Sequence, residues 1–283
     1  MVTSFVQFAD AKRREAARED IPRLLTIERG PLDTTLPGIG NAWTRQKYDG
    51  DFRLFPPPET FPAVSLVFVQ SREGNTGANN PEELGGGRTD KHLIYEGLSR
   101  VAADGVLAGA ATATGADVFF SVWHPHLVEL RRSLGLAEHP AQIVVSGKGP
   151  LDLEGTRLFN VPEVPVYVLL GVTCREGCAA GLARRPWIVV LPFEPGGLSD
   201  ALARLRQDHG ISRISAVGGR TTASALIDAG LVQDLCLTTT ARSAGEPNTP
   251  LYVGKQPPRF ERVVVKRGTD LQEPITFEHL AIV

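Results

Sequence analysis

From residue 61 onward, short apolar runs alternate with amphipathic segments. Residues 64–69 form an almost uninterrupted apolar run, which is typical of a strand buried on both faces of a sheet. Similar runs predict further strands at residues 104–109, 142–146, 164–170, 187–191, 211–217 and 231–237. Residues 262–266 and 275–283 follow one another without a helix between them, so we expect two closing antiparallel strands there.

Helical periodicity separates these runs. Helices are expected from residue 89 or 90 to about 103, and at residues 126–134, 198–209 and 223–229. Thr89 or Asp90 is expected to cap the first of them, and Thr221 and Thr222 the last, which Gly230 ends. Strands that alternate with helices predict an α/β fold with a mixed sheet and helices on both of its faces.

Residues 1–60 differ from the rest of the chain. Residues 9–19 are charged and rich in alanine, which predicts an exposed helix, and Leu24, Leu25 and Ile27 are candidates for docking on the main body. Prolines and glycines dominate residues 31–58. We therefore divide the chain into an N-terminal extension at residues 1–60, which wraps the core or serves an interface, and a main domain at residues 61–283.

Composition excludes several classes of protein. The net charge is −2 over 283 residues, so there is no basic footprint for nucleic acid. No apolar run approaches the length of a membrane span, and the first residues lack the apolar core of a signal peptide. Cys174 and Cys178 have no partner pair at zinc-binding spacing, and we interpret them as thiols in a reducing compartment. A cytoplasmic enzyme or small-molecule-binding protein is expected.

Familiar catalytic motifs are missing. There is no P-loop and no G-x-S-x-G elbow, and Asp90 stands where Gly85-Gly86-Gly87 would need a third glycine for a G-x-G-x-x-G fingerprint. His124 and His126 flank Pro125 and could form a metal pair, but no acidic or cysteine partner lies at useful spacing. We expect both histidines to be solvated and no metal to be bound.

Glycines and small residues follow three of the expected strands. Gly218-Gly219 precedes Arg220, Thr221 and Thr222 at the start of a helix, an arrangement that suits a phosphate or pyrophosphate. A tight connection between strand and helix is the alternative interpretation. Gly109 to Thr112 ends a second strand. If the two strands are neighbours, their ends form one crevice for a dinucleotide, and Ser146 and Lys148 after a third strand would hold an adenosine 2′-phosphate, favouring NADPH over NADH.

Taken together, these stretches resemble the C-terminal reductase domain of the bifunctional riboflavin-biosynthesis deaminase/reductase, a family with a dihydrofolate-reductase-like fold. Three ordered segments carry the resemblance: Ser71-Arg72-Glu73-Gly74, then Asp90 through Arg100 and Asp104 to Gly109-Ala110-Ala111-Thr112, then Val217-Gly218-Gly219 through Gly230-Leu231-Val232-Gln233-Asp234-Leu235. The resemblance implies a three-layer αβα domain with a central mixed, mostly parallel sheet, NADPH bound across the strand ends, and a homodimer.

The resemblance also implies roles for individual residues. The NADPH would be held by Thr112, Ser146 and residues 218–222, and Gly109 and Ala110 would allow its close approach. Arg100 would contact the substrate, Ser71 would lie beside the nicotinamide, and Glu73 would take the place of the family's loop aspartate. Glu73 is then the candidate general acid, and we expect partial burial to raise its pKa.

Some positions depart from the family pattern. Val217 stands where the pyrimidine reductases carry a glutamate, and residues 113–117 lack the V-R-x-D-x-P continuation that follows Thr112 in the family. Two functions therefore stay open. The first is an NADPH-dependent reductase that transfers hydride to a C=N or C=O group of a small substrate. The second is a diverged, non-catalytic nucleotide-binding protein of the same fold.

Overall fold

A ten-stranded sheet runs through the whole molecule in the computed structural model, which describes residues 4–78, 81–147, 149, 151–268 and 274–283. Its strands are β1 (Leu24–Arg29), β4 (Ala63–Gln70), β5 (Gly105–Gly109), β6 (Ala141–Ser146), β7 (Val166–Gly171), β8 (Ile188–Phe193), β9 (Arg213–Val217), β10 (Val232–Thr239), β11 (Phe260–Gly268) and β12 (Thr276–Ile282). Two short strands, β2 (Gly38–Ile39) and β3 (Phe52–Arg53), pair separately.

The strand order is β1-β11-β12-β10-β4-β9-β5-β6-β7-β8. Every pair from β10 to β8 is parallel, and the pairs that join β1, β11, β12 and β10 are antiparallel. The predicted mixed, mostly parallel sheet and its closing antiparallel strands are therefore confirmed.

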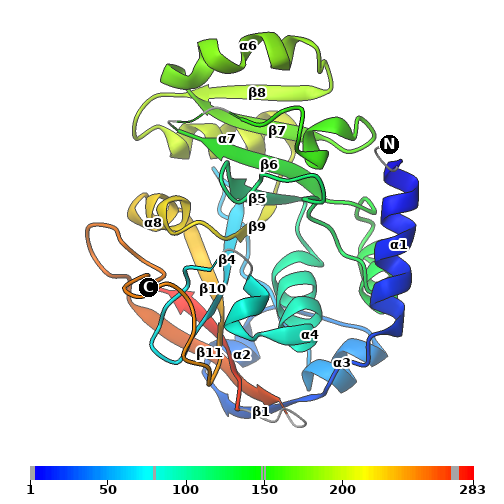
Figure 1. Cartoon of the computed structure of the whole chain (residues 1–283). Coiled ribbons are helices and arrows are strands. Elements are labelled where there is room, and N and C mark those ends of the chain that lie inside the picture. Colours follow the sequence, from blue (N-terminus) through cyan, green and yellow to red (C-terminus); the bar gives the residue numbers. More distant parts are fainter. Residues whose placement is uncertain (1–3, 79–80, 148, 150, 269–273) are drawn as a thin grey trace.

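Helices cover both faces of the sheet (Figure 1). The helices of the chain are α1 (Phe5–Arg18), α2 (Leu32–Thr35), α3 (Ala42–Tyr48), α4 (Gly87–Thr89), α5 (Pro125–Ser133), α6 (Arg175–Ala183), α7 (Leu198–His209) and α8 (Arg220–Asp228), with the π-helix η2 (Asp90–Arg100) and the 3₁₀ turns η1 (Pro81–Leu84), η3 (Arg157–Asn160) and η4 (Val172–Cys174). One apolar core includes residues of α1, η2 and α5, and the other includes residues of α7 and α8. This is a three-layer αβα arrangement.

Residues 4–60 take part in this architecture. Strand β1 adds to the edge of the main sheet by pairing with β11 in antiparallel register, from Leu24 opposite Gly268 to Arg29 opposite Val264. Leu24 is fully buried, whereas Leu25 and Ile27 stay exposed, as expected of an edge strand with one covered face. Helix α1 lies along one side of the molecule (Figure 1). It packs next to α5, and its Glu15 pairs with Lys91 of η2 at 3.6 Å.

Two predicted helix caps are wrong. Helix α8 begins at Arg220 with Gly219 as its N-cap residue, so Thr221 and Thr222 lie inside its first turn and cap nothing. Asp90 is likewise inside a helix, because α4 runs without a break into η2. Gly230, at φ 66°, ends α8 as predicted. Within the described residues, no helix has both the length and the apolar character needed to cross a membrane.

Candidate active site

Two of the predicted glycine-bearing strand ends meet. Strands β5 and β9 are parallel neighbours, with Ala108 opposite Val217. A Cβ atom at Gly109 would lie 2.6 Å from Oγ1 of Thr222, and one at Gly218 would lie 3.1 Å from Cγ2 of Thr112. The backbones after the two strands therefore approach as closely as glycine allows.

The backbone geometry of this crevice fits a phosphate-bearing ligand. Gly218 and Gly219 have φ angles of 62° and 78°, a conformation that side-chain-bearing residues rarely adopt. The turn they make leads directly into α8, so the first backbone N–H groups of the helix lie at the end of β9. Unsatisfied N–H groups at the start of a helix attract anions. The turn therefore offers backbone donors of the kind that bind a dinucleotide pyrophosphate.

The third strand end lies beside the other two. Strand β6 pairs with β5, and the backbone N–H of Ala110 donates to the carbonyl oxygen of Val145 at 2.9 Å. Ser146 is buried and its hydroxyl donates to the carbonyl oxygen of Gly149 at 2.6 Å. The prediction for Lys148 falls outside the described residues.

The loop after β4 holds Ser71 and Glu73. Ser71 is fully buried, and its hydroxyl donates to Glu73 at 3.0 Å. Ser243 donates a second hydrogen bond to the same carboxylate at 2.6 Å. The Glu73 side chain is 42% exposed. These hydroxyl donors, Ser243 first, hold the pKa of Glu73 below its usual range, so the expectation that burial raises this pKa is wrong.

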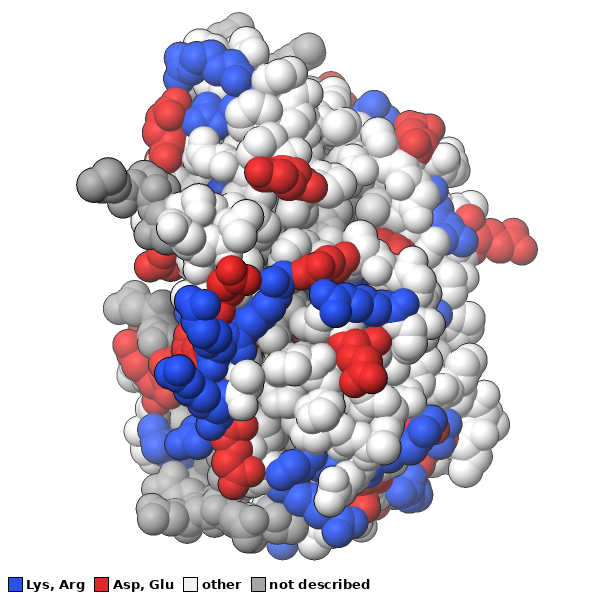
Figure 2. All heavy atoms as spheres, turned by 90° about the vertical axis from the view of Figure 1, so that its right-hand side faces the viewer, with Lys and Arg blue, Asp and Glu red and all other residues white. Residues whose placement is uncertain are grey.

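A pocket of about 720 Å³ lies beside η2. Residues from α1, the α4–η2 helix and the segment before α5 line it: Glu15, Glu19, Glu82, Gly87, Arg88, Asp90, Lys91, Tyr95, Glu96, Arg100 and Trp123. Figure 2 views the molecule from the side of α1 and shows acidic and basic side chains interspersed on this face. The pocket gathers Arg100, which the sequence singled out, with groups that it did not.

Asp90, which the sequence favoured as a helix cap over a catalytic residue, is the main group whose role the structure changes. It is 5% exposed and lines the pocket. Thr238, near the carboxyl end of β10, donates its hydroxyl to Oδ1 of Asp90. Burial outweighs this hydrogen bond and raises the pKa of Asp90 to about 7. A buried carboxyl group that exchanges its proton near neutral pH is the group that general acid catalysis requires.

Helix geometry explains why Asp90, Tyr95 and Arg100 share the pocket. They are spaced five residues apart, and in an α-helix neighbours at that spacing point about 140° away from each other. The wider turn of a π-helix, which bonds residue i to i+5, brings them toward one side. The sequence predicted an ordinary helix here. The periodic apolar positions identified its buried face, but not the altered pitch.

Arg100 has a hydrogen-bond donor for which the described residues provide no acceptor. It is 6% exposed, and one guanidinium nitrogen donates to the carbonyl oxygen of Ser121 at 2.8 Å. Its Nε is buried and has no hydrogen-bond partner among the described residues. Burial lowers the pKa of Arg100 to about 10, so the side chain stays charged at neutral pH. A buried, charged donor at a pocket wall favours a ligand with an acceptor group.

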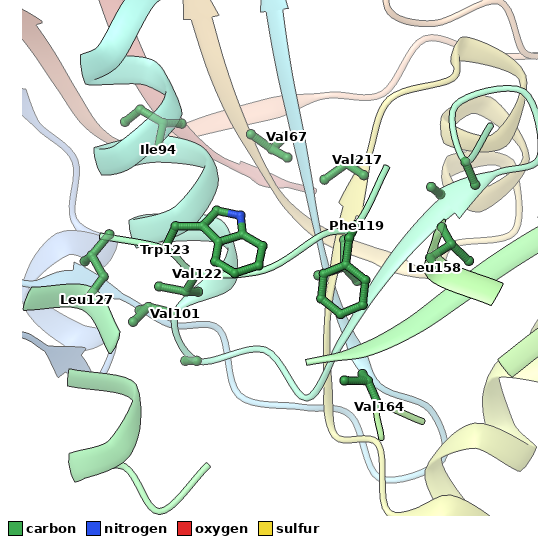
Figure 3. Close-up of a cluster of buried hydrophobic side chains, with 14 of the residues drawn as sticks. Val67, Ile94, Val101, Phe119, Val122, Trp123, Leu127, Leu158, Val164 and Val217 are labelled. Atoms are coloured by element: carbon green, nitrogen blue, oxygen red, sulfur yellow. The ribbon is translucent and has the colours of Figure 1, made fainter. Parts of the chain in front are cut away.

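Asp90 of the pocket and the glycine turn after β9 lie toward the same edge of the sheet. Thr238 pairs with Val69, and Val67 pairs with Val217, so the ends of β10, β4 and β9 follow one another. Trp123 lines the pocket and belongs to the same apolar core as Val67 and Val217 (Figure 3). Asp90, held by Thr238, and the glycine turn after β9 therefore both lie toward the carboxyl ends of neighbouring parallel strands.

The histidine prediction is half wrong. His126 is half-exposed, as expected, but His124 is only 5% exposed and stacks on Trp43, with 4.2 Å between ring centroids. Burial, followed by the nearby His92, lowers the pKa of His124 to about 4. Trp43 comes from the N-terminal extension, so the contact that buries His124 depends on a distant part of the chain.

A second buried polar cluster lies on the central strands. Asp234, Cys236 and His279 bring their ligand-type atoms within 4.8 Å of one another. Nε2 of His279 is 2.9 Å from Oδ2 of Asp234, and Ser65 donates to the same oxygen at 2.7 Å. Burial, with Asp234 adjacent, raises the pKa of the Cys236 thiol well above its usual range. We interpret this cluster as a hydrogen-bonded network in the core.

Comparisons with known proteins agree with this architecture. The family model described as the RibD C-terminal domain matches residues 63–271. A pyrimidine reductase-like protein from Corynebacterium diphtheriae aligns with a TM-score of 0.60 at 21% identity, covering 78% of this chain and 92% of that protein. The riboflavin biosynthesis reductase Rib7 of Saccharomyces cerevisiae aligns with a TM-score of 0.55 at 14% identity, covering 79% of this chain and 92% of that protein.

RibD of Acinetobacter baumannii aligns with a TM-score of 0.59 at 19% identity over 80% of this chain. This chain spans 59% of that protein's length. At these identities the structural likeness establishes the fold. No curated protein sequence matches the chain.

Proposed function

Because this chain belongs to the RibD C-terminal domain family, we propose that it is an NADPH-dependent reductase that transfers hydride to a C=N or C=O group of a small heterocyclic substrate. The observation that carries the proposal is the buried carboxyl group of Asp90, which faces a pocket beside a glycine-lined crevice. A cofactor crevice and an acid in an adjoining pocket are the two parts that a reductase needs.

The crevice holds the cofactor in this proposal. Backbone N–H groups at Gly219, Arg220 and the start of α8 bind the pyrophosphate, and Gly109 and Gly218 leave room for the side chains of Thr222 and Thr112 beside it. Ala110, Thr112, Thr221 and Thr222 line the same strand ends, and Ser146 and Lys148 bind the 2′-phosphate. When bound, NADPH supplies the hydride.

The pocket holds the substrate. Arg100 donates from its unpartnered Nε to an acceptor atom of the substrate and fixes its orientation. Asp90, protonated below about pH 7, donates a proton to the nitrogen or oxygen of the group that is reduced. Thr238 keeps the carboxyl group in place by its hydrogen bond. We therefore transfer the acid role from Glu73 to Asp90.

Glu73 and Ser71 take a different part in this proposal. Glu73 bridges the loop after β4 to Ser243, and Ser71 accepts from the backbone N–H of Asn75 at 3.3 Å. These contacts shape the loop at the carboxyl end of β4, where the nicotinamide would lie. In this proposal Glu73 holds the loop in position and does not serve as the proton donor.

Cofactor binding is the first test. NADPH titrated into the protein, with quenching of tryptophan emission as the signal, is expected to saturate well below about 1 mM, the concentration equivalent to −4 kcal/mol. NADH is expected to bind more weakly. Absence of saturable NADPH binding in this range would rule out both NADPH as the cofactor and the proposed reductase function.

Turnover is the second test. Oxidation of NADPH, followed by its absorbance, is measured with 5-amino-6-(5-phosphoribosylamino)uracil, the substrate in the name of a structurally similar Thermotoga maritima enzyme, and with a panel of other cyclic imines and ketones. Complementation of a strain that lacks the riboflavin reductase separates that pathway from another substrate. Binding of NADPH with no turnover on any of them would instead support a diverged, non-catalytic binding protein.

The resemblance also motivates two assignments about the protein in the cell. We propose a homodimer and a cytoplasmic location. Sedimentation equilibrium of the purified chain checks the first, and localisation of a fluorescently tagged chain checks the second.

A further inference from the structure

The N-terminal extension supplies one wall of the substrate pocket. Glu15 in α1 and Glu19, the residue that ends this helix, line the pocket. Both precede residue 63, where the match to the family model begins. The extension is therefore an addition to the family domain that reaches the site where the substrate is proposed to bind.

Ion pairs hold this wall against η2. Nζ of Lys91 lies 2.8 Å from Oε1 of Glu19 and 3.6 Å from a carboxylate oxygen of Glu15. Nε2 of His92, which is fully buried, lies 3.3 Å from Oε2 of Glu19. Glu19 itself is only 16% exposed, so the wall is fixed by contacts on two neighbouring residues of η2.

The ion pairs with Glu15 and Glu19 also neutralise the positive charge of Lys91. The pocket lining carries five carboxyl groups, against the three cations Arg88, Lys91 and Arg100. Lys91 is committed to the two glutamates of the extension. Arg100 offers one unpartnered, buried Nε, which suits a single acceptor atom of an uncharged group. A phosphate group would bring two negative charges close to carboxylates in a partly dry site, which is unfavourable.

The segment after Thr112 also lacks the positive charge that would favour a phosphate group. Residues 113–117 read Ala-Thr-Gly-Ala-Asp and contain no basic residue. Cations near a phosphate would have to come from such a segment or from the pocket wall. Residues 113–117 provide none, and among the three cations of the pocket wall Lys91 is already paired with Glu15 and Glu19.

We propose that the N-terminal extension makes this pocket selective for uncharged or cationic substrates and against phosphate esters. This inference rests on the proposed function for the location of the substrate, and it names the substrate class. Glu15 and Glu19 are its specificity-determining residues.

The first experiment measures the charge of the pocket without any substrate. Trp123 is made the only tryptophan by Trp43→Phe and Trp187→Phe, and its emission is quenched with caesium, iodide and neutral acrylamide. Relative to acrylamide, caesium is expected to quench at least about threefold better than iodide. Glu15→Gln with Glu19→Gln is expected to remove most of this difference, and the exposed Glu129→Gln to leave it unchanged.

Equal or better quenching by iodide would overturn the proposal, and so would a Trp123 that acrylamide does not reach, because the pocket would then be closed to small solutes. Neither result depends on NADPH, so the quenching experiment tests the charge of the pocket independently of the proposed reductase function.

The second experiment uses two compounds that differ only in a phosphate: 5-amino-6-(5-phosphoribosylamino)uracil and its dephosphorylated form. With NADPH, kcat/KM is expected to be at least about tenfold higher for the dephosphorylated compound than for the phosphorylated one. Glu15→Gln combined with Glu19→Gln is expected to reduce this ratio of kcat/KM values. A preference for the phosphorylated compound would overturn the proposal while supporting the reductase. If neither is reduced, the quenching result alone decides the charge selectivity.

Discussion

The hydroxyl of Thr238 donates a hydrogen bond to the carboxyl group of Asp90 across 148 positions of sequence. Thr238 lies near the carboxyl end of β10, and Asp90 is the first residue of η2. The contact fixes a buried acid at the edge of the sheet where ligands of α/β proteins bind. It makes Asp90 the centre of the proposed chemistry.

Asp90→Asn is expected to lower kcat by about 10²- to 10⁴-fold, because the variant keeps the hydrogen bond to Thr238 but has no acidic proton to donate. NADPH affinity is expected to change little, since Asp90 faces the pocket and not the crevice. Steady-state kinetics and NADPH titration check both. Glu73→Gln is the control: if it abolished turnover while Asp90→Asn retained it, the acid would be Glu73.

The pH dependence of the rate gives an independent check. A general acid has to be protonated, so kcat is expected to fall as the pH rises above about 7, the pKa of Asp90. A pH–rate profile in which this limb persists unchanged in Asp90→Asn would assign it to another group.

The same carboxyl group affects stability. Its pKa is about 7 in the folded protein against an ordinary value of 3.8, so between these values the folded state binds more protons than the unfolded state. Stability therefore decreases as the pH rises from about 4 to 7. Denaturant unfolding at pH 5 and pH 8 is expected to show Asp90→Asn gaining stability relative to wild type mainly at pH 8. An equal effect at both values would contradict the raised pKa.

The close approach of Gly109 and Thr222 can be tested by a double-mutant cycle. Gly109→Ala places a Cβ 2.6 Å from Oγ1 of Thr222 and is expected to cost about 1–3 kcal/mol of stability. Thr222→Ala removes the clashing atom, so the double variant is expected to recover most of this loss. NADPH affinity is expected to stay reduced, because the new methyl group occupies the cofactor's surface. Recovery of both quantities would exclude Gly109 from the cofactor site.

The Asp234–His279 pair is expected to be a major contributor to stability. Asp234→Ala leaves a fully buried imidazole without its partner and is expected to cost about 3–5 kcal/mol. Ser65→Ala removes only one hydrogen bond to Asp234 and is expected to cost about 1 kcal/mol. Urea unfolding measures both. Similar values for the two variants would show that the hydroxyl, and not the imidazole, dominates the network.

His124, which is buried, and His139, which is mostly buried, are expected to destabilise the protein in mild acid. Burial is the largest of the effects that lower the pKa of His124 and of His139 to about 4. Between this value and the ordinary pKa of about 6.5 the unfolded state binds more protons, so stability decreases as the pH falls through that range. Replacing His139 by Asn is expected to flatten this part of the stability profile. An unchanged slope would mean that other groups dominate it.

Local patterns predicted much of the fold. Continuous apolar runs identified β4 to β10, because strands buried on both faces need apolar side chains at every position. The glycines after β5 and β9 predicted a crevice, and the pairing of these two strands places both at one edge. The edge strand β1 and the helix α3 were missed, since their short segments are fixed by contacts with β11 and η2 rather than by their own periodicity.

The sequence by itself determined the α/β class and the family, and its two glycines marked the turn after β9, because a positive φ favours glycine. The pocket was decided by tertiary structure. Asp90 reads as a helix cap until the π-helix places it in one pocket with Arg100 and Thr238 holds it from another element. Burial, which only the packed structure creates, then converts an ordinary carboxylate into an acid that titrates near neutrality.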